Sequence, residues 1–455
     1  MKKIAIGGGQ GFWGDSNDAA VHLLRHGDIQ YLGCDYLAEL TLSIMARQKL
    51  KNPDAGYARD FIGLMREAGA DAYRRGIRVI TNAGGMNIAG AVEALRAEMA
   101  AQGLRGYRIG YVLGDDLKDR IPDLLAQGVE FRNIDDVGDF SEIRDQVFNA
   151  NVYYGHEAIA DCLAQGADTV LCGRAADSAM FLAPFVHEFG WAADDWDDLA
   201  RGIMAGHLLE CGGQGSGGNF QYGWRQVPDM DDLGFPIAEI GPDTFEITKA
   251  ENCGGLICEQ SCKEQFLYEV HDPANYLTPD VNVDISRATL TQTGENRVRV
   301  GGVRGKPRPD TLKLSIGYHA GYKVVGMLSF AWPDAYEKAQ YAAEILMKKM
   351  RRKGLQAEDV HISYIGLNSL HLGVADMSPA QIEGLNEVVL RIAVRTREKA
   401  QAAKLIPEIA PLQLNGPPGA SFFGGRPHVQ EVIGLWPTLI PRDALKLTTH
   451  ILEVE

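Results

Sequence analysis

The sequence concentrates its most reactive side chains in residues 207–219, HLLECGGQGSGGN. His207, Glu210 and Cys211 are spaced i, i+3 and i+4, so a helix ending here would carry all three on one face. Five glycines follow within residues 212–218, and glycine permits positive φ and exposes backbone amides to a ligand. We therefore predict a site here, with His207, Glu210 and Cys211 as its candidate catalytic residues.

The position of these side chains at a helix end favours some chemistries over others. The dipole at a helix C-terminus supports a protonated His207 and opposes a Cys211 thiolate. His207 and Glu210 therefore suit a general acid–base pair, because burial and each other's charge can tune both pKa values. Three alternatives stay open: a Cys211 nucleophile, a divalent metal held by His207 and Glu210 with an unidentified third ligand, and a structural histidine before a glycine-terminated helix.

The first half of the chain alternates the elements that must position these residues. Short apolar runs predict strands at Lys3–Gly8, Ile29–Cys34, Arg78–Ala83, Arg108–Leu113 and Thr169–Cys172. Amphipathic segments predict helices at Ala58–Arg74, Ile88–Ala101, Glu157–Gln165, Ala176–Phe189 and Trp196–Cys211. This alternation is typical of an α/β fold with a doubly wound, mostly parallel sheet. In such sheets ligands bind at the carboxyl ends of the strands, near the switch point.

The rest of the chain shows two further sequence patterns. Residues 231–320 show short strands and turns with little helical periodicity, which predicts a strand-rich extension of the main domain. Beyond them we predict strands at Tyr322–Ala331, Val360–Leu367, Val388–Thr396 and His428–Trp436, and helices at Asp334–Arg352 and Glu398–Ile409. The order βαββαβ is that of a ferredoxin-like α+β fold. The expected domains are thus 1–230 (Rossmann-like), 231–320 (extension) and 321–455 (ferredoxin-like).

Several polar residues directly follow predicted strands, where a ligand would bind. Arg174 can receive a carboxylate or phosphate, with Asp177 placed to hold its guanidinium. The turn NAGGMN at residues 82–87 opens a helix, and its amides and asparagines suit a carboxylate or carbonyl. The alternatives are a plain Arg–Asp pair and turn chemistry with a helix cap. The candidate substrate-binding residues are Gly9, Gln10, Gly11, Asp35, Asn82, Gly84, Gly85, Asn87, Arg174, Asp177, Gln214 and Asn219.

Residues 9–14, GQGFWG, form a GxGxxG pattern after the first predicted strand. Asp35 stands about where an acid that binds ribose belongs. Two features argue against a nicotinamide cofactor: Phe12 and Trp13 are bulky where the backbone would approach a pyrophosphate, and Asp15 places negative charge at the helix N-terminus. We therefore expect no NAD(P) and identify no other cofactor. A cap by Asp15 or Ser16 is the structural alternative.

The length of the chain indicates how many domains to expect, and its net charge excludes some classes of binding partner. The 455 residues exceed the roughly 250–300 at which single cores stop growing, so more than one domain is expected. The net charge is −15, and phosphate binding needs a basic surface, so we expect no nucleic acid and no membrane partner. A small-molecule acid or acyl-CoA is the expected ligand, and we expect a homo-oligomer.

The compartment follows from the cysteines and the N-terminus. No stretch approaches the ~20 continuous apolar residues of a transmembrane helix. Met1–Ile6 leads directly into a strand pattern without the apolar core of a signal peptide. Seven cysteines, an odd number, argue for reduced thiols. We therefore expect a cytoplasmic protein.

Taken together, these motifs resemble the acyclic terpene utilisation (AtuA) family. The resemblance covers about residues 1–330, and its order and spacing are specific as a set. It rests on CDYLAELT (34–41), NAGG (82–85), GAD to GRAAD (166–177), GHLLEC (206–211), QFLYEV (265–270) and PDV (279–281). The sequence departs from the family at residues 251–255, ENCGG, where we expect a Gly-Thr-Gly-Gly-like turn.

The resemblance implies a catabolic enzyme or accessory protein that acts on branched or terpenoid acids, as free acids or CoA thioesters. It also implies a small partner protein, but it assigns no reaction and no catalytic residues. The residues favour a lyase of the hydratase/dehydratase kind, because water addition beside a carbonyl needs an acid–base pair and an anion-stabilising pocket. The alternatives are an acyl hydrolase using Cys211 or a metal-bound water, a non-catalytic ligand-binding or scaffold subunit, and, last, an oxidoreductase.

Overall fold

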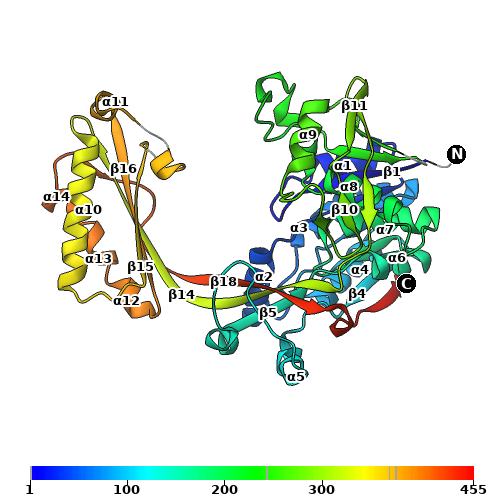
Figure 1. Cartoon of the computed structure of the whole chain (residues 1–455), viewed down its shortest axis with the longest axis horizontal. Helices are drawn as coiled ribbons and strands as arrows, with labels where there is room; N and C mark the ends of the chain where they lie inside the picture. The colour runs from blue at the N-terminus through cyan, green and yellow to red at the C-terminus, as the bar shows by residue number, and fades with distance from the viewer. Residues whose placement is uncertain (1–2, 242–243, 368, 375–376) are drawn as a thin grey trace. The chain divides into compact units, whose positions relative to one another are not determined.

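The computed structural model describes residues 3–241, 244–367, 369–374 and 377–455, which form a mixed α/β protein with large mixed sheets (Figure 1). The chain divides into two compact units. Unit 1 comprises Met1–Gly317 and Leu435–Glu455, and unit 2 comprises Tyr318–Gly434. The last residues of the chain thus pack in unit 1, whereas the sequence pattern predicts them in a C-terminal domain of residues 321–455.

A ten-stranded sheet, in the order β11-β12-β8-β7-β1-β2-β3-β6-β4-β19, forms the frame of unit 1. Its centre is parallel and consists of β1 (Ile4–Gln10), β2 (Tyr31–Cys34), β3 (Arg78–Thr81), β6 (Thr169–Leu171) and β4 (Arg108–Leu113). Antiparallel strands extend both edges: β7 (Pro236–Ile240), β8 (Phe245–Lys249), β12 (Arg297–Gly301) and β11 (Thr289–Gly294) beyond β1, and β19 (Thr448–Glu453) beyond β4.

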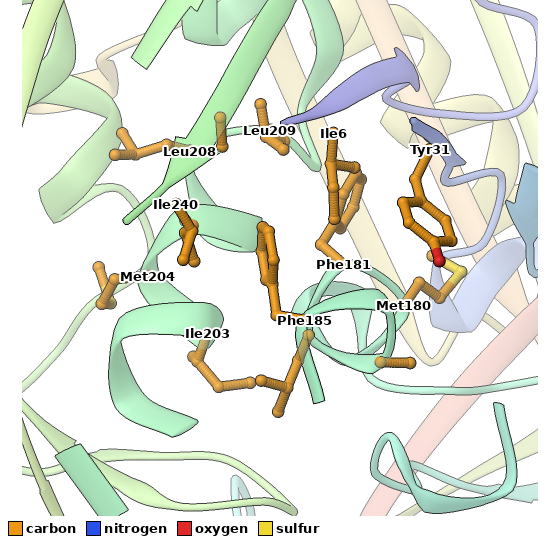
Figure 2. Packing of buried hydrophobic residues seen from close by; sticks show 14 of the residues in the cluster. Ile6, Tyr31, Met180, Phe181, Phe185, Ile203, Met204, Leu208, Leu209 and Ile240 are labelled. Carbon is orange, nitrogen blue, oxygen red and sulfur yellow. The ribbon is translucent and has the colours of Figure 1, made fainter. Parts of the chain in front are cut away.

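Two hydrophobic clusters cover this sheet, and each takes its helices from a different part of the chain. One contains apolar residues of α1 (Asp18–His26), α2 (Glu39–Lys51), α3 (Arg59–Arg75) and α4 (Ile88–Ala101). The other contains residues of α6 (Glu157–Ala164), α7 (Asp177–Phe189), α8 (Trp196–His207) and α9 (Glu259–Leu267). Figure 2 shows Phe181 and Phe185 of α7 among Ile6, Ile203 and Ile240 in the second cluster.

The segments predicted as a strand-rich extension belong to unit 1. Besides β7, β8, β11 and β12, they include a small antiparallel sheet in the order β13-β10-β9, made of Arg304–Lys306, Asn282–Asp284 and Tyr276–Leu277. Unit 1 also contains α5 (Ile121–Ala126) and β5 (Val147–Val152), and β5 pairs with β14 (Thr311–Ala331).

Unit 2 is built around a sheet in the order β15-β16-β14-β17. Its strands are β15 (Asp359–Ile365), β16 (Glu387–Thr396), the second part of β14 and β17 (Ala420–Phe422), and β18 (Val429–Pro441) also pairs with β14. Its helices are α10 (Ala335–Arg352), α11 (Pro379–Glu383), α12 (Lys399–Ala403), α13 (Ile406–Ile409) and α14 (Leu412–Asn415). Its core joins Val324 and Leu328 of β14 to Ala339 and Leu346 of α10 and Ile392 of β16.

Two predicted helices have different ends in the structure, and each difference has a local cause. The helix predicted at Trp196–Cys211 ends at His207, because the backbone beyond it forms turns that lead to Gly212 at φ +53°. The helix predicted at Glu398–Ile409 is divided into α12 and α13, and Pro407, which has no amide to donate, lies in the first turn of α13.

No helix in the described parts of the chain combines the length and the apolar composition that crossing a membrane requires.

Because β2 lies very close to α7, a side chain added at Gly33 of β2 is predicted to disturb the packing of the core. A Cβ on Gly33 would lie 2.7 Å from Cζ of Phe181, inside the core of unit 1. We expect Gly33→Ala to lower the free energy of unfolding by about 1–3 kcal/mol, as overpacking does. The matched control is Gly63→Ala in α3, where the nearest atom is 3.7 Å away, and alanine is expected to be neutral or slightly stabilising. Equal thermal unfolding midpoints for both variants would contradict this packing.

Candidate functional site

Buried polar residues follow three neighbouring strands of the parallel sheet. Asp35 follows β2, Asn82 follows β3, and Arg174 lies just beyond β6; their exposed fractions are 5%, 0% and 2%. Because β2, β3 and β6 are parallel neighbours, their carboxyl ends meet at one edge of the sheet. The prediction that these three residues share this edge is therefore matched by the strand order.

Asp35 and Asn82 form one hydrogen-bonded pair. Nδ2 of Asn82 donates to Oδ1 of Asp35 at 2.6 Å, and Oδ1 of Asn82 accepts from the Tyr36 amide at 2.7 Å. Burial raises the pKa of Asp35 well above its usual range, and the nearby charge of Asp177 raises it further, against the opposing effect of Arg174. Asp35 is therefore a carboxyl group that takes up a proton more readily than an exposed aspartate.

Arg174 is a buried cation with incomplete pairing. Its Nη2 donates to Oδ1 of Asp177 at 2.6 Å, and its guanidinium lies 4.0 Å from the centre of the Tyr153 ring. Its Nε and Nη1 atoms are buried without a hydrogen-bond partner among the described residues. The Arg174 amide donates to Oδ2 of Asp115 at 2.8 Å, which fixes the backbone beyond β6.

Tyr153 also links Arg174 to a second ion pair. Its hydroxyl donates to Glu39, which also accepts from Nζ of Lys313 at 3.0 Å. Burial alone would raise the pKa of Glu39, but the Tyr153 hydrogen bond and the charge of Lys313 together lower it to about 2. Glu39 is therefore a permanent anion at neutral pH.

His207 and Glu210 form a pair at the end of α8. Nδ1 of His207 lies 2.9 Å from Oε1 of Glu210, and Ser178 donates to Oε2 of Glu210 at 2.8 Å. Burial opposes protonation of His207, but the Glu210 hydrogen bond and charge outweigh it and raise the pKa of His207. Burial also raises the pKa of Glu210, and the bond to His207 offsets this only in part. The two groups therefore titrate as one coupled pair.

A cavity of about 290 Å³ in unit 1 is lined by some of these groups. Asp177, Ser178 and Glu210 line it together with Tyr153 and Lys313. The first amides of α7, at Asp177 and Ser178, lie at a helix N-terminus and have no acceptor within the helix. Arg174 is not among the lining residues, since it lies behind Tyr153 and Asp177. We call this space the α7 cavity.

Cys211 and the glycine-rich segment lie at a different cavity, of about 570 Å³. Cys211, Gln214, Asn219 and Gly11 line it, with several aspartates that include Asp15. Burial and the charge of Glu210 raise the pKa of the Cys211 thiol to about 12, so the thiolate is disfavoured there. The helix predicted to carry His207, Glu210 and Cys211 on one face ends at His207. Glu210 lines the α7 cavity, Cys211 lines the other cavity, and His207 is buried and lines neither of these two.

The GxGxxG segment begins at the end of the strand β1 and continues into the turn before α1. Gly9 and Gln10 are its last residues, and Gln10 donates to Oδ1 of Asn17 at 2.7 Å. The Gly11 amide donates to Oδ2 of Asp15 at 3.0 Å, so an internal carboxylate occupies the position a phosphate would need. A Cβ on Gly11 would lie 2.7 Å from the Cys211 backbone, which explains its glycine by close packing.

The turn at residues 82–87 uses most of its amides internally. Gly85 donates to the Asn82 carbonyl, Asn87 to that of Gly84 and Met86 to that of Gly56. The Asn87 side chain caps α4 at the Gly90 amide. The structural alternative, a turn with a helix cap, accounts for Gly84, Gly85 and Asn87, whereas Asn82 remains part of the polar network.

A comparison with known protein families shows to which family the chain belongs. The family model described as "Acyclic terpene utilisation family protein AtuA" matches residues 4–451. The chain belongs to the AtuA family. The match extends beyond the region of about 1–330 in which the sequence motifs were recognised, so it includes unit 2. No curated protein and no solved structure matches the chain.

In this AtuA family member the sequence patterns did not reveal Ser178, Tyr153 and Lys313, which line the α7 cavity, or Glu39, which pairs with Tyr153 and Lys313. Ser178 directly follows the predicted Asp177, so its place in the same helical turn was an available signal. Tyr153, Glu39 and Lys313 come from three distant segments and carry no motif that links them. Only the folded chain brings these three side chains together.

The lowered pKa of Glu39 predicts an acid-sensitive contribution to stability. A carboxyl whose pKa falls on folding stabilises the protein above its unfolded value of 4.5, and this contribution is lost as pH falls toward about 2. We expect Glu39→Gln to destabilise the protein at pH 7, and by roughly 1 kcal/mol less at pH 3.5. Denaturant unfolding at both pH values measures this difference.

The matched control for this experiment is Glu93→Gln, which disrupts an exposed pair with Arg96. Such a pair contributes less than about 1 kcal/mol, so its loss is expected to be small at both pH values. A Glu39→Gln effect that does not change between pH 7 and pH 3.5 would refute the role of the Glu39 charge.

Proposed function

We propose that this protein is an enzyme of branched-chain, terpenoid or other carboxylic acid catabolism, of the hydratase or dehydratase kind. The observation that carries the proposal is the Ser178–Glu210–His207 chain at the α7 cavity, where Glu210 faces the cavity and His207 is buried behind it. The substrate is proposed to be a carboxylate or an acyl-CoA. Membership in a family named for acyclic terpene utilisation supports the substrate class.

The proposed reaction uses Glu210 as the group that moves a proton. In hydration of a carbon–carbon double bond beside a carbonyl, ionised Glu210 takes a proton from water as the water oxygen bonds to the β-carbon. The electron pair of the double bond moves toward the carbonyl to give an enolate. As the carbonyl re-forms, this electron pair takes the proton held by Glu210 onto the α-carbon. His207 is a positioning residue here, because its bond to Glu210 sets the charge and orientation of that carboxylate.

Binding of the anionic part of the substrate is assigned to Lys313 and the first amides of α7. Lys313 lines the α7 cavity, and a helix N-terminus favours negative charge. Arg174 acts behind them, where its buried charge holds Asp177 and raises the potential of the pocket. Arg174 is therefore proposed to support the residues that contact the substrate and not to contact the substrate itself.

The hydrolase alternative receives less support. Cys211 lines the other cavity, and a thiol with its pKa raised to about 12 is a poor nucleophile at neutral pH. The non-catalytic alternative, a ligand-binding subunit with a small partner protein, predicts binding of the same ligand class without turnover by the wild-type chain.

We also propose the fold of each unit, the location of the protein and its assembly. The parallel strands with helix clusters on both sides support a doubly wound arrangement in unit 1. In unit 2 the sheet order β15-β16-β14-β17, with α10 between β14 and β15, supports a ferredoxin-like fold. A cytoplasmic location and a homo-oligomer remain predictions.

The acid–base proposal is tested by a substrate screen with matched variants. Purified protein is incubated with unsaturated branched acids and their CoA thioesters, and mass spectrometry measures addition or loss of water. We expect Glu210→Gln and His207→Gln to lower kcat at least a hundredfold, as loss of general acid–base catalysis does by about 10²–10⁴. Cys211→Ser is the control and is expected to keep its activity. Full turnover by Glu210→Gln would exclude this role.

The anion-binding assignment predicts a separate effect on KM. Lys313→Met removes the cavity cation and is expected to raise KM for an anionic substrate about tenfold, equivalent to ~1.4 kcal/mol of binding. The control Lys306→Met removes the same charge near Ala274 and Asn275, at residues that do not line the cavity. Steady-state kinetics of both variants measure the difference, and equal KM values would rule out Lys313 as the anion contact.

A further inference from the structure

A second group of potential ligands lies outside the residues assigned to proton transfer. His156 and Glu157 open α6, and Asp280 precedes β10. One ligand atom from each lies within 4.8 Å of the others, and this is the one such group of histidine, cysteine and acidic residues in the described part of the chain. His207 and Glu210 are not part of it, so no third metal ligand joins that pair among those residues.

Asp280 is the centre of this group and is incompletely satisfied. Its side chain is fully buried, and Oδ1 accepts from the His156 amide at 2.9 Å and lies 2.7 Å from Nδ1 of His156. The second oxygen, Oδ2, is buried without a hydrogen-bond partner among the described residues. A buried carboxylate oxygen without a partner is costly, and a bound cation is one of the few groups that removes the cost.

Gly155 has no side chain, and this leaves room for the carboxylates of Asp280 and Glu157 to lie close together. A Cβ at this position would clash with Oδ1 of Asp280 and would lie 2.9 Å from Oε2 of Glu157. The other oxygen of Glu157, Oε1, accepts from Arg308. Glu157 therefore directs one oxygen to an arginine and the other toward Asp280, where two negative groups meet beside a single imidazole.

We propose that His156, Glu157 and Asp280 bind a divalent transition-metal ion of the Zn²⁺ class. One imidazole nitrogen with two carboxylates is a donor set that such ions accept, and three protein ligands leave a position for water. Protons compete with the ion for these ligands, because a coordinating imidazole nitrogen and a coordinating carboxylate must both be unprotonated.

The ion would join two segments that form part of the α7 cavity. It connects the residues before α6 to the turn at residues 278–281, where Thr278 accepts from the Val281 amide. Thr278 and Pro279 of this turn line the α7 cavity. The proposed ion thus fixes a wall of that cavity and takes no part in the proton transfer assigned to Glu210.

Isothermal titration of chelator-treated protein with Zn²⁺ tests the site directly. We expect one bound ion per chain, with an affinity that falls as the pH is lowered, because protons compete for the same ligands. Asp280→Asn and His156→Gln are each expected to weaken binding at least tenfold. Glu157→Gln is the surface variant that keeps the test valid where a buried change impairs folding, and it is expected to weaken binding several-fold.

The matched control is Asp161→Asn, which removes a carboxylate from the same helix, outside the ligand group. It is expected to bind Zn²⁺ as the wild type does. Equal Zn²⁺ affinity in wild type, Asp280→Asn and Glu157→Gln would overturn the proposal, as would the absence of binding to the wild type. Failure of the hydratase screen leaves this result unaffected, because metal binding is measured without turnover.

Discussion

The burial of Arg174 is the constraint around which the carboxyl edge of the sheet is organised. A guanidinium removed from water needs compensating negative charge and hydrogen bonds. Asp177 supplies one ion pair and the Tyr153 ring a face to stack on, while Asp35 and Glu39 contribute charge from farther away. Each of the acids Asp177 and Glu39 is paired with a cation, so the edge concentrates charge without leaving those carboxylates isolated.

Close backbone packing is the second constraint, and it decides where the reactive side chains point. A Cβ on Gly8 would lie 2.6 Å from the Leu209 carbonyl, so the end of β1 contacts the turn after α8 directly. This contact places Glu210 beside Ser178 of α7 and leaves Cys211 at the other cavity. Glu210 and Cys211, which are adjacent in the chain, therefore have different environments and different chemistry.

The regular elements of the fold were largely predictable because they carry local patterns. The strand Arg108–Leu113 and the helix Ile88–Ala101 have the predicted bounds, since apolar periodicity and the cap at Asn87 are properties of short segments. The helix α2 and the strands β5 and β19 were not predicted. The apolar residues of α2 do not gather strongly on one face and β5 contains two asparagines, so neither segment has the pattern of its element. β19 is stabilised by pairing with β4, a distant strand.

The sequence by itself determined that a polar edge exists, because Asp35, Asn82 and Arg174 each follow a recognisable strand and parallel strands end at one edge. It also determined the family, through motifs that keep their order along the chain. Only the tertiary structure decided which of the candidates share a cavity. His207 and Glu210 are joined to Ser178, whereas Cys211 is not, and Tyr153, Glu39 and Lys313 meet from three segments. The reason is that cavity membership depends on long-range packing and on where a helix ends, neither of which is encoded in residue spacing.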